Sequence, residues 1–241
     1  MRDVFVRDLV DQTIVRISIS SAGAESNGAS SRPAISSDGR YVAFRSTGTN
    51  LVSGDTNAFE DVFVHDRDPD GNGVFDEGNG ITELISPGTF APGDGDSSSP
   101  VISADGRYVS FHSDATNLVD GDQNALRDVF LFDRNTATLT RISQCNSGVA
   151  GDGVSERPAI TADGRIIAYH SMASTFGGGD SNMTSDIFVL DRLASSETND
   201  CGQPPSTPPP PSGACGAMGF IPTFIMLLSM SLLRSAKKEA S

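Results

Sequence analysis

The sequence predicts an all-β fold made of β-propeller blades, each a four-stranded antiparallel sheet, and two repeated motifs are the basis. A turn segment occurs three times, as PAISSDGRYVAFRS from Pro33, PVISADGRYVSFHS from Pro100 and PAITADGRIIAYHS from Pro158. A strand of the Asp-Val-Phe type occurs four times at spacings of 58, 67 and 58 residues, from Asp3, Asp61, Asp128 and Asp186. Such self-similarity indicates a repeat protein, and repeated four-stranded antiparallel units are typical of propeller blades.

Each repeat divides into four short β-segments, strands a to d. Strand a is the Pro-Ala-Ile-Ser type run, strand b is YVAFRS, YVSFHS or IIAYHS, strand c is the Asp-Val-Phe run, and strand d is TIVRIS, ITELIS or TLTRIS. An Asp-Gly pair joins a to b, because glycine accepts a positive φ and aspartate bonds the turn backbone. Side chains alternate along a strand, so Val42 and Phe44 should face one side of the sheet. Tyr41, Ala43 and Arg45 should face the other.

The repeats begin and end in mid-blade. Within residues 1–192, strands c and d of one blade occupy 3–18, full blades occupy 33–86 and 100–143, and strands a to c of a fourth occupy 158–192. A closed propeller typically has at least about four blades. We therefore expect an incomplete propeller or an open arc of blades, in a chain that is the C-terminal part of a longer protein.

The motifs also resemble those of the TolB-like, WD-repeat-like β-propeller repeats of bacteria. The signature of that family is Pro-x-x-Ser-x-Asp-Gly-x-x-hydrophobic-x-Phe, and the turn segments match it apart from Thr161 and Tyr169 in the last copy. The resemblance covers roughly residues 3–192. It implies a periplasmic or extracellular scaffold that binds other proteins or ligands across the propeller face.

A ten-residue insertion between strands c and d of the blade at 33–86 holds the sharpest metal-binding motif. Residues 66–77 read DRDPDGNGVFDE, which fits the D-x-[DN]-x-[DN]-G-x₅-E spacing of an EF-hand calcium loop. The expected ligands are Asp66, Asp68, Asp70, Asn72 through its carbonyl, and Glu77. Calcium takes roughly six to eight oxygen ligands, so the pattern predicts one structural Ca²⁺ site. Gly73 and the flanking strands depart from a true EF-hand, and a metal-free acidic hairpin tip is the alternative.

Two other repeated features are interpreted as structural. GDxN loops lie at 54–57, 121–124 and 179–182, and their recurrence in every unit favours turn formation, since Asp and Asn side chains bond their own backbone. A second metal site is the alternative for these loops. The aspartates that open strand c, Asp61, Asp128 and Asp186, are expected to form hydrogen bonds between blades.

Catalytic motifs are sparse, and we expect no enzyme activity. His112 and His170 occupy the repeat position of Arg45, so they are variants of one structural position. Ser113 and Ser171 follow these histidines directly, and neighbouring strand residues face opposite ways, so neither pair makes a nucleophile and its base. No G-x-S-x-G, H-E-x-x-H or phosphate-binding loop occurs in the sequence.

The formal net charge is −14, and both lysines, Lys237 and Lys238, lie at the C-terminal end. The acidic body should repel phosphate backbones, which disfavours nucleic-acid binding and favours calcium and cationic partners. The cysteines are too few for a disulfide framework. One bridge is possible, with Cys145 and Cys201 as the candidate pair and Cys215 left over.

The last fifty residues change character. Residues 193–215 form a Pro/Ser-rich linker, 216–233 are uncharged and mostly apolar, and 234–241 are basic. This order predicts a transmembrane or sorting helix with a cytoplasmic basic tail, and a buried core helix is the alternative. It is similar to bacterial C-terminal sorting tails, in which the helix is cleaved after export.

Together these features predict an envelope-anchored, non-enzymatic propeller that displays a binding surface for an unidentified protein or ligand outside the cytoplasm, with possible stabilisation by calcium. The alternative is an accessory or gating propeller of a larger secreted hydrolase. A catalytic domain in the full-length gene would favour that alternative.

Overall fold

The computed structural model describes residues 1–145, 147–176 and 184–193, which lie in one compact unit, Met1–Ser206. The predicted linker beyond residue 193, the apolar segment 216–233 and the basic tail 234–241 lie outside the described residues. Within the described part, no helix has the length and apolar character needed to cross a membrane.

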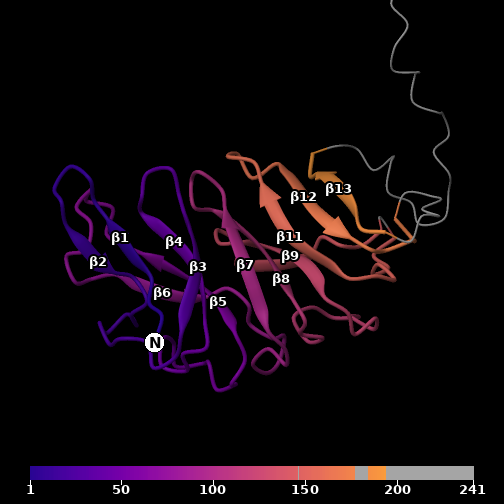
Figure 1. Cartoon of the computed structure of the whole chain (residues 1–241), viewed down its shortest axis with the longest axis horizontal. Helices are drawn as coiled ribbons and strands as arrows, with labels where there is room; N and C mark the ends of the chain where they lie inside the picture. The colour runs from indigo at the N-terminus through magenta and orange to yellow at the C-terminus, as the bar shows by residue number, and fades with distance from the viewer. Residues whose placement is uncertain (146, 177–183, 194–241) are drawn as a thin grey trace, which may run out of the picture. The chain divides into compact units, whose positions relative to one another are not determined.

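The described residues form antiparallel sheets that follow one another along the chain (Figure 1). The first pairs β1 (Phe5–Arg7) with β2 (Ile14–Arg16). The second has the order β3 (Ser30–Ile35), β4 (Tyr41–Ser46), β5 (Asp61–Asp66), β6 (Ile81–Leu84). The third has the order β7 (Ser97–Ile102), β8 (Tyr108–Ser113), β9 (Asp128–Asp133), β10 (Thr138–Arg141). The fourth has the order β11 (Ser155–Ile160), β12 (Ile166–Ser171), β13 (Asp186–Asp191).

This order confirms the predicted four-stranded antiparallel sheets with strands a to d, and the first and last sheets hold two and three strands among the described residues. The b and c strands pair in the same register in each repeat, so that Phe44 lies opposite Phe63, Phe111 opposite Phe130 and Tyr169 opposite Phe188. The insertion also lies where it was predicted. Residues 67–80 connect β5 to β6, whereas 134–137 connect the equivalent β9 to β10.

Strand a begins three residues before the proline at which the sequence motif starts, and a β-bulge explains the difference. The register shifts between Ser31 and Ala34, and the equivalent shift recurs in β7 and β11. The residue before each proline has a positive φ, at 52° for Arg32, 54° for Ser99 and 54° for Arg157. Proline cannot donate to a strand ladder, so a bulge is where a strand can accommodate it.

The sheets pack face to face through apolar side chains that alternate as predicted. Val42 and Phe44 lie in a cluster with Val4 and Ile17 of the first sheet. Ala43 lies in a different cluster with Phe111, toward the third sheet. A further cluster, which includes Ile167 and Tyr169, joins the third and fourth sheets. The second and third sheets therefore bury both faces, whereas the first and fourth leave one face exposed among the described residues, and the core is a series of layers between blades.

Besides the apolar layers, the SxDGR turn of one blade contacts the preceding blade, through the approach of its glycine to a tyrosine ring. In the third sheet, Ser103 Oγ donates to Asp105 (2.5 Å) and Arg107 N donates to the same carboxylate (3.0 Å). The next glycine, Gly106, has φ +71°, and a Cβ built there would lie 2.0 Å from the ring of Tyr41 in the second sheet. Gly164 has the same relation to Tyr108. Glycine is needed at these positions both for its conformation and for this close approach.

Candidate functional site

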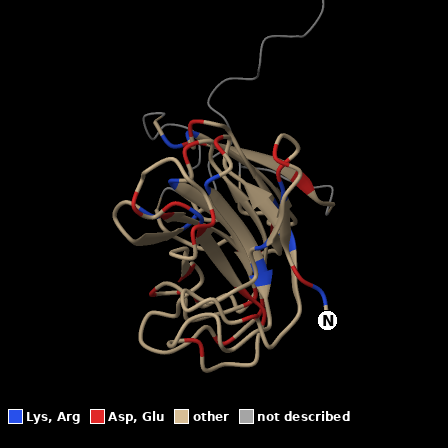
Figure 2. Ribbon diagram, turned by 90° about the vertical axis from the view of Figure 1, so that its left-hand side faces the viewer, with Lys and Arg blue, Asp and Glu red and all other residues tan. Residues whose placement is uncertain are grey.

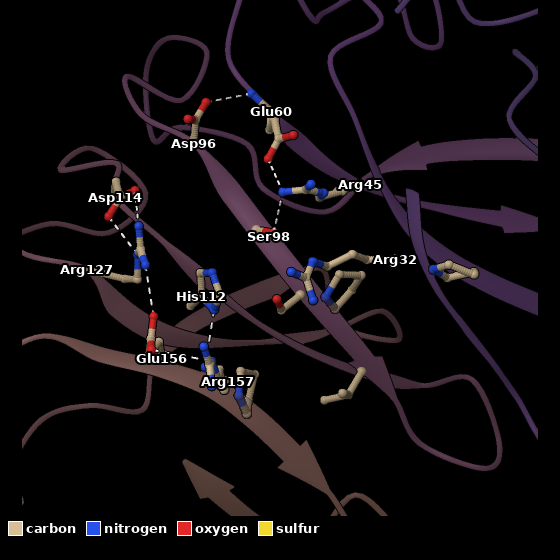
Figure 3. Close-up of a pocket in the computed structure, with 15 residues that line it drawn as sticks. Arg32, Arg45, Glu60, Asp96, Ser98, His112, Asp114, Arg127, Glu156 and Arg157 are labelled. Atoms are coloured by element: carbon tan, nitrogen blue, oxygen red, sulfur yellow. Dashed lines mark hydrogen bonds and ion pairs between the residues drawn. The ribbon is translucent and has the colours of Figure 1, made fainter. Parts of the chain in front are cut away.

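A polar cleft of about 730 Å³ lies where the a strands β3, β7 and β11 come together. Its lining comes from those strands, from β4 and β8, and from residues next to the ends of β5, β7, β8 and β9 (Figure 3). The charged and histidine side chains around it are Arg32, Arg45, Glu60, Asp96, His112, Asp114, Arg127, Glu156 and Arg157.

Arg45 joins the second and third sheets at one side of this cleft. Its Nε donates to Ser31 Oγ (2.9 Å) on the neighbouring strand of its own sheet. Its Nη1 donates to Ser98 Oγ on β7 (3.1 Å) and forms an ion pair with Glu60. The backbone N of Glu60 in turn donates to Asp96 (2.8 Å), so that both carboxylates have partners (Figure 3).

Arg127 has the same role between the third and fourth sheets. Its Nε and Nη2 donate to the two oxygens of Asp114, at 2.9 and 2.8 Å. Its Nη1 donates to Glu156 on β11 (2.9 Å). A bidentate pair of this kind fixes the guanidinium plane. Arg45 and Arg127 therefore form ion pairs with Glu60, Asp114 and Glu156, and the remaining carboxylate of the cleft, Asp96, accepts a backbone N–H.

His112 lies between these two arginine networks and is 8% exposed. Its Nδ1 accepts a hydrogen bond from the backbone N–H of Arg157 (3.2 Å). Burial, with the nearby charge of Arg127, lowers the pKa of His112 to about 4, so the ring is neutral at pH 7. Because Nδ1 accepts, the proton is assigned to Nε2, which is then a hydrogen-bond donor at the cleft.

Arg32 and Arg157 are the cleft cations that remain available. Arg32 forms no hydrogen bond or ion pair with any described residue, and Arg157 is 70% exposed with one long contact (3.5 Å) to Glu156. Elsewhere the charged segments lie largely in loops and turns (Figure 2). The cleft thus offers two accessible guanidiniums beside a neutral imidazole.

Sequence reasoning identified only part of this cleft. Arg45 and His112 were interpreted as variants of one structural position, while Glu60, Arg127 and Glu156 were missed. The available signal was variation between copies, because the position before strand c is Glu60 in one repeat and Arg127 in the next. Repeat positions that differ between otherwise matching copies are candidates for function.

The predicted calcium loop is only partly assembled. Asp66 forms a bidentate pair with Arg40 (2.7 and 2.8 Å), and its Oδ1 also accepts the backbone N–H of Asp68 (3.0 Å). The Nδ2 of Asn72 donates to Asp70 (3.2 Å) and to Glu77 (2.7 Å), and Asp68 accepts the backbone N–H of Asn72 (3.0 Å). Among the described residues, no group of three or more His, Cys, Asp or Glu side chains converges as a metal site. Calcium binding here stays a prediction.

The pairing of Asp66 with Arg40 has a structural explanation, because it recurs in each blade. Arg107 pairs in the same way with Asp133 (2.9 and 2.8 Å), and Arg165 pairs with Asp191 (2.8 and 2.6 Å). The arginine of the SxDGR turn therefore binds the aspartate that ends strand c. The first aspartate of the calcium motif belongs to this repeated pair.

In the GDxN loops that the structure describes, the asparagine supports the turn and its neighbours by hydrogen bonds, as predicted. Asn57 Nδ2 donates to Asp61 (2.9 Å) and to the carbonyl of Gly93 in the loop before the next blade (3.2 Å). Ser86 Oγ also donates to Asp61 (2.7 Å). Asn124, Asp128 and Ser143 repeat this arrangement. The third loop, at 179–182, lies outside the described residues.

The remaining candidates have structural surroundings. His65 is buried, its Nδ1 lies 2.8 Å from Thr82 Oγ1, and burial lowers its pKa. Ser113 Oγ pairs with Ser97 Oγ (2.8 Å) instead of with His112. Cys145 is disulfide-bonded, while Cys201 and Cys215 lie outside the described residues.

The sheets and their shared register define the class of this protein as a β-propeller repeat protein. No family model matches the chain, and no curated protein matches it. Among solved structures it is similar to TolB from Acinetobacter baumannii, with 15% identity, a TM-score of 0.44, and coverage of 82% of this chain and 37% of that one. It is also similar to the β-propeller domain of the Trilobed protease from Pyrococcus furiosus, with 14% identity, a TM-score of 0.40, and coverage of 72% and 41%. A third similar structure is oligogalacturonate lyase from Vibrio parahaemolyticus, with 11% identity, a TM-score of 0.42, and coverage of 80% of this chain and 42% of that one. This chain thus spans less than half the length of each of these three.

Proposed function

We propose that this chain is a non-enzymatic propeller scaffold whose cleft binds an extracellular protein segment or ligand that carries carboxylates. The observation behind the proposal is the pair Arg32 and Arg157: the Arg32 side chain forms no ion pair with a described residue, and Arg157 is largely exposed with one long contact (3.5 Å) to Glu156. Arg45 and Arg127 are already held in ion pairs with Glu60, Asp114 and Glu156, which line the same cleft. The arginines and carboxylates that line the cleft are equal in number, so a ligand carboxylate would bind by direct contact with the two accessible guanidiniums and not through a net positive charge of the cleft.

Carboxylates are the favoured ligand groups because arginine binds them in a bidentate manner. The neutral ring of His112 adds an N–H donor between the two guanidiniums, and the bulges place the backbone of each arginine at the cleft. A phosphate backbone has the right charge for these groups, but long-range repulsion by a protein of net charge −14 disfavours nucleic acid. An acidic peptide segment, which carries few charges, meets less of this repulsion.

The test is fluorescence anisotropy with a labelled peptide of alternating Glu and Ser, compared with a Gln-Ser peptide of equal length. The wild-type chain should bind the acidic peptide more tightly, and binding should weaken as salt screens the charges. The Arg32→Ala/Arg157→Ala double variant should bind it at least about tenfold more weakly, since a hydrogen bond to a charged group contributes about 1.5–3 kcal/mol.

Arg7→Ala is the matched control, because Arg7 lies on β1, outside the cleft, and bonds only Gln12 (3.0 Å) among the described residues. This variant should bind like the wild type. Equal affinity for the two peptides, or equal losses in the cleft and control variants, would contradict the proposal.

The location and the calcium site complete the proposal. We propose that residues 216–233 hold the propeller at the cell envelope, outside the cytoplasm. Membrane fractionation of cells that express the chain with and without this segment tests the anchor. We also propose that Ca²⁺ stiffens the loop 66–77 through Asp68, Asp70 and Glu77. Titration calorimetry of the wild type and of Asp70→Ala tests this site, and an absence of binding heat in both would refute it.

A further inference from the structure

A second acidic feature is buried in the blades, away from the insertion loop. In each described GDxN loop the aspartate lies near the aspartate that opens strand c. These pairs are Asp122 with Asp128 in the third sheet, which share one arginine nitrogen, and Asp55 with Asp61 at the same repeat positions in the second. Asp55 is 4% exposed and Asp61 is fully buried. Two buried carboxylates so close together repel each other and need a positive charge.

The third sheet supplies that charge from its own chain. Arg141, the last residue of β10, places Nη1 at 3.2 Å from Asp122 and 3.8 Å from Asp128. The side chains of Arg141 and Asp122 are 3% and 1% exposed. A guanidinium thus occupies the space between the two carboxylates.

The second sheet lacks this arginine. Arg141 lies opposite Phe130 in the ladder, and the residue in the same register opposite Phe63 is Leu84. Leu84 packs against the apolar cluster between the first two sheets. No described Lys or Arg forms an ion pair with Asp55 or Asp61, and Oδ1 of Asp55 is buried without a hydrogen-bond partner. The second sheet therefore has the same pair of carboxylates, but it lacks the arginine that lies between them in the third sheet.

We propose that a calcium ion binds between Asp55 and Asp61, in the position that the Arg141 guanidinium occupies in the neighbouring blade. The available donors are hard oxygens, which calcium prefers. Each Asp61 oxygen accepts a single side-chain hydrogen bond, from Ser86 (2.7 Å) or from Asn57 (2.9 Å), and has a further lone pair. Two carboxylates match a double positive charge, and water or backbone carbonyls complete the coordination. This site is separate from the loop 66–77 and does not depend on the ligand proposed for the cleft.

Leu84→Arg is the decisive substitution, because it copies the arginine of the neighbouring blade. All proteins carry Asp70→Ala, which disables the loop site, and thermal unfolding of the full chain is followed in EDTA, in NaCl, in MgCl₂ and in CaCl₂. At calcium about 100-fold above its Kd, the Asp70→Ala protein should melt about 5–10 °C higher than in EDTA. Adding Leu84→Arg should abolish this shift.

Asp55→Asn, which removes one ligand charge at nearly constant shape, provides an independent measurement if the arginine variant fails to fold. It too should lose most of the calcium shift. The proposal is overturned if the Asp70→Ala protein shows no shift with calcium, if either second substitution leaves the shift intact, or if NaCl at equal ionic strength produces the whole effect. A melting temperature that responds only to acidification would also overturn it, because protonation would then neutralise the pair.

Discussion

Replacement of Gly106 by alanine is the sharpest test of how the blades are joined. Gly106 has φ +71°, a left-handed conformation that costs an L-residue about 1–2 kcal/mol. The new Cβ would also lie 2.0 Å from Cδ2 of Tyr41 on the preceding blade. Overpacking of this kind typically adds about 1–3 kcal/mol. We therefore expect Gly106→Ala to lower the free energy of unfolding by about 2–5 kcal/mol.

Gly23→Ala separates the two contributions. Gly23 has nearly the same conformation, with φ +79°, but a Cβ added there would meet no atom within 4 Å. It should show only the conformational cost of about 1–2 kcal/mol. In a Tyr41→Ala background the extra cost of Gly106→Ala should vanish, which gives a coupling energy of about 1–3 kcal/mol. Urea unfolding followed by far-ultraviolet circular dichroism measures the free energy of unfolding of the wild type and of each of these variants. Equal costs for the two glycines would refute the proposed contact between blades.

Three further predictions follow from buried groups. Ser143→Ala should destabilise the fold by about 1–3 kcal/mol in urea unfolding, because it leaves Asp128 and the N–H of Val129 without the hydroxyl they both bond, and an unchanged midpoint would contradict this. Phe111→Ala should cost about 3–5 kcal/mol since Phe111 is fully buried, whereas Phe90→Ala, at 94% exposure, should change stability by less than about 0.5 kcal/mol. The pKa of His112 falls from 6.5 to about 4 on folding, so between these pH values the unfolded chain takes up a proton that the folded chain does not. The free energy of unfolding should therefore be highest above pH 6.5 and should decrease by up to about 3 kcal/mol as the pH falls toward 4. His112→Asn should remove that part of the pH dependence, and parallel stability curves for the two proteins from pH 7 to pH 4 would count against it.

The strands and turns were predictable because their determinants are local. Asp38 and Gly39 form a turn with Ser36, whose hydroxyl donates to Asp38 (2.5 Å), and all three lie within a few residues of one another. The alternation of Val42 and Ala43 between two faces follows from strand geometry alone. Three copies of one pattern also give the register without any knowledge of tertiary structure.

The cleft could not be predicted in this way, because it depends on which side chains of successive blades meet. Arg127 and Glu156 are far apart in the sequence and become partners only when β11 packs beside β8 and β9.

The calcium motif shows that a correct sequence pattern does not by itself assemble a site. Its spacing is correct, but a contact with Arg40, outside the motif, takes its first aspartate. The spacing of a motif shows which ligand residues are present, but it does not show which side chains elsewhere in the fold bind those ligands instead.

The cations of the blades are arginines, since both lysines lie at the C-terminal end, and the contacts between blades explain this choice. Arg107 forms two hydrogen bonds with Asp133 while its guanidinium lies over the ring of Tyr108, 4.6 Å from the centroid. Arg192 also lies over that ring, 4.1 Å from the centroid, and donates to the carbonyl of Gly164. A planar guanidinium can bind a carboxylate at its edge and stack through its face, whereas a lysine ammonium has no such plane. This blade junction uses both properties at once, so an arginine-to-lysine change there would lose the stacking even where the charge is kept.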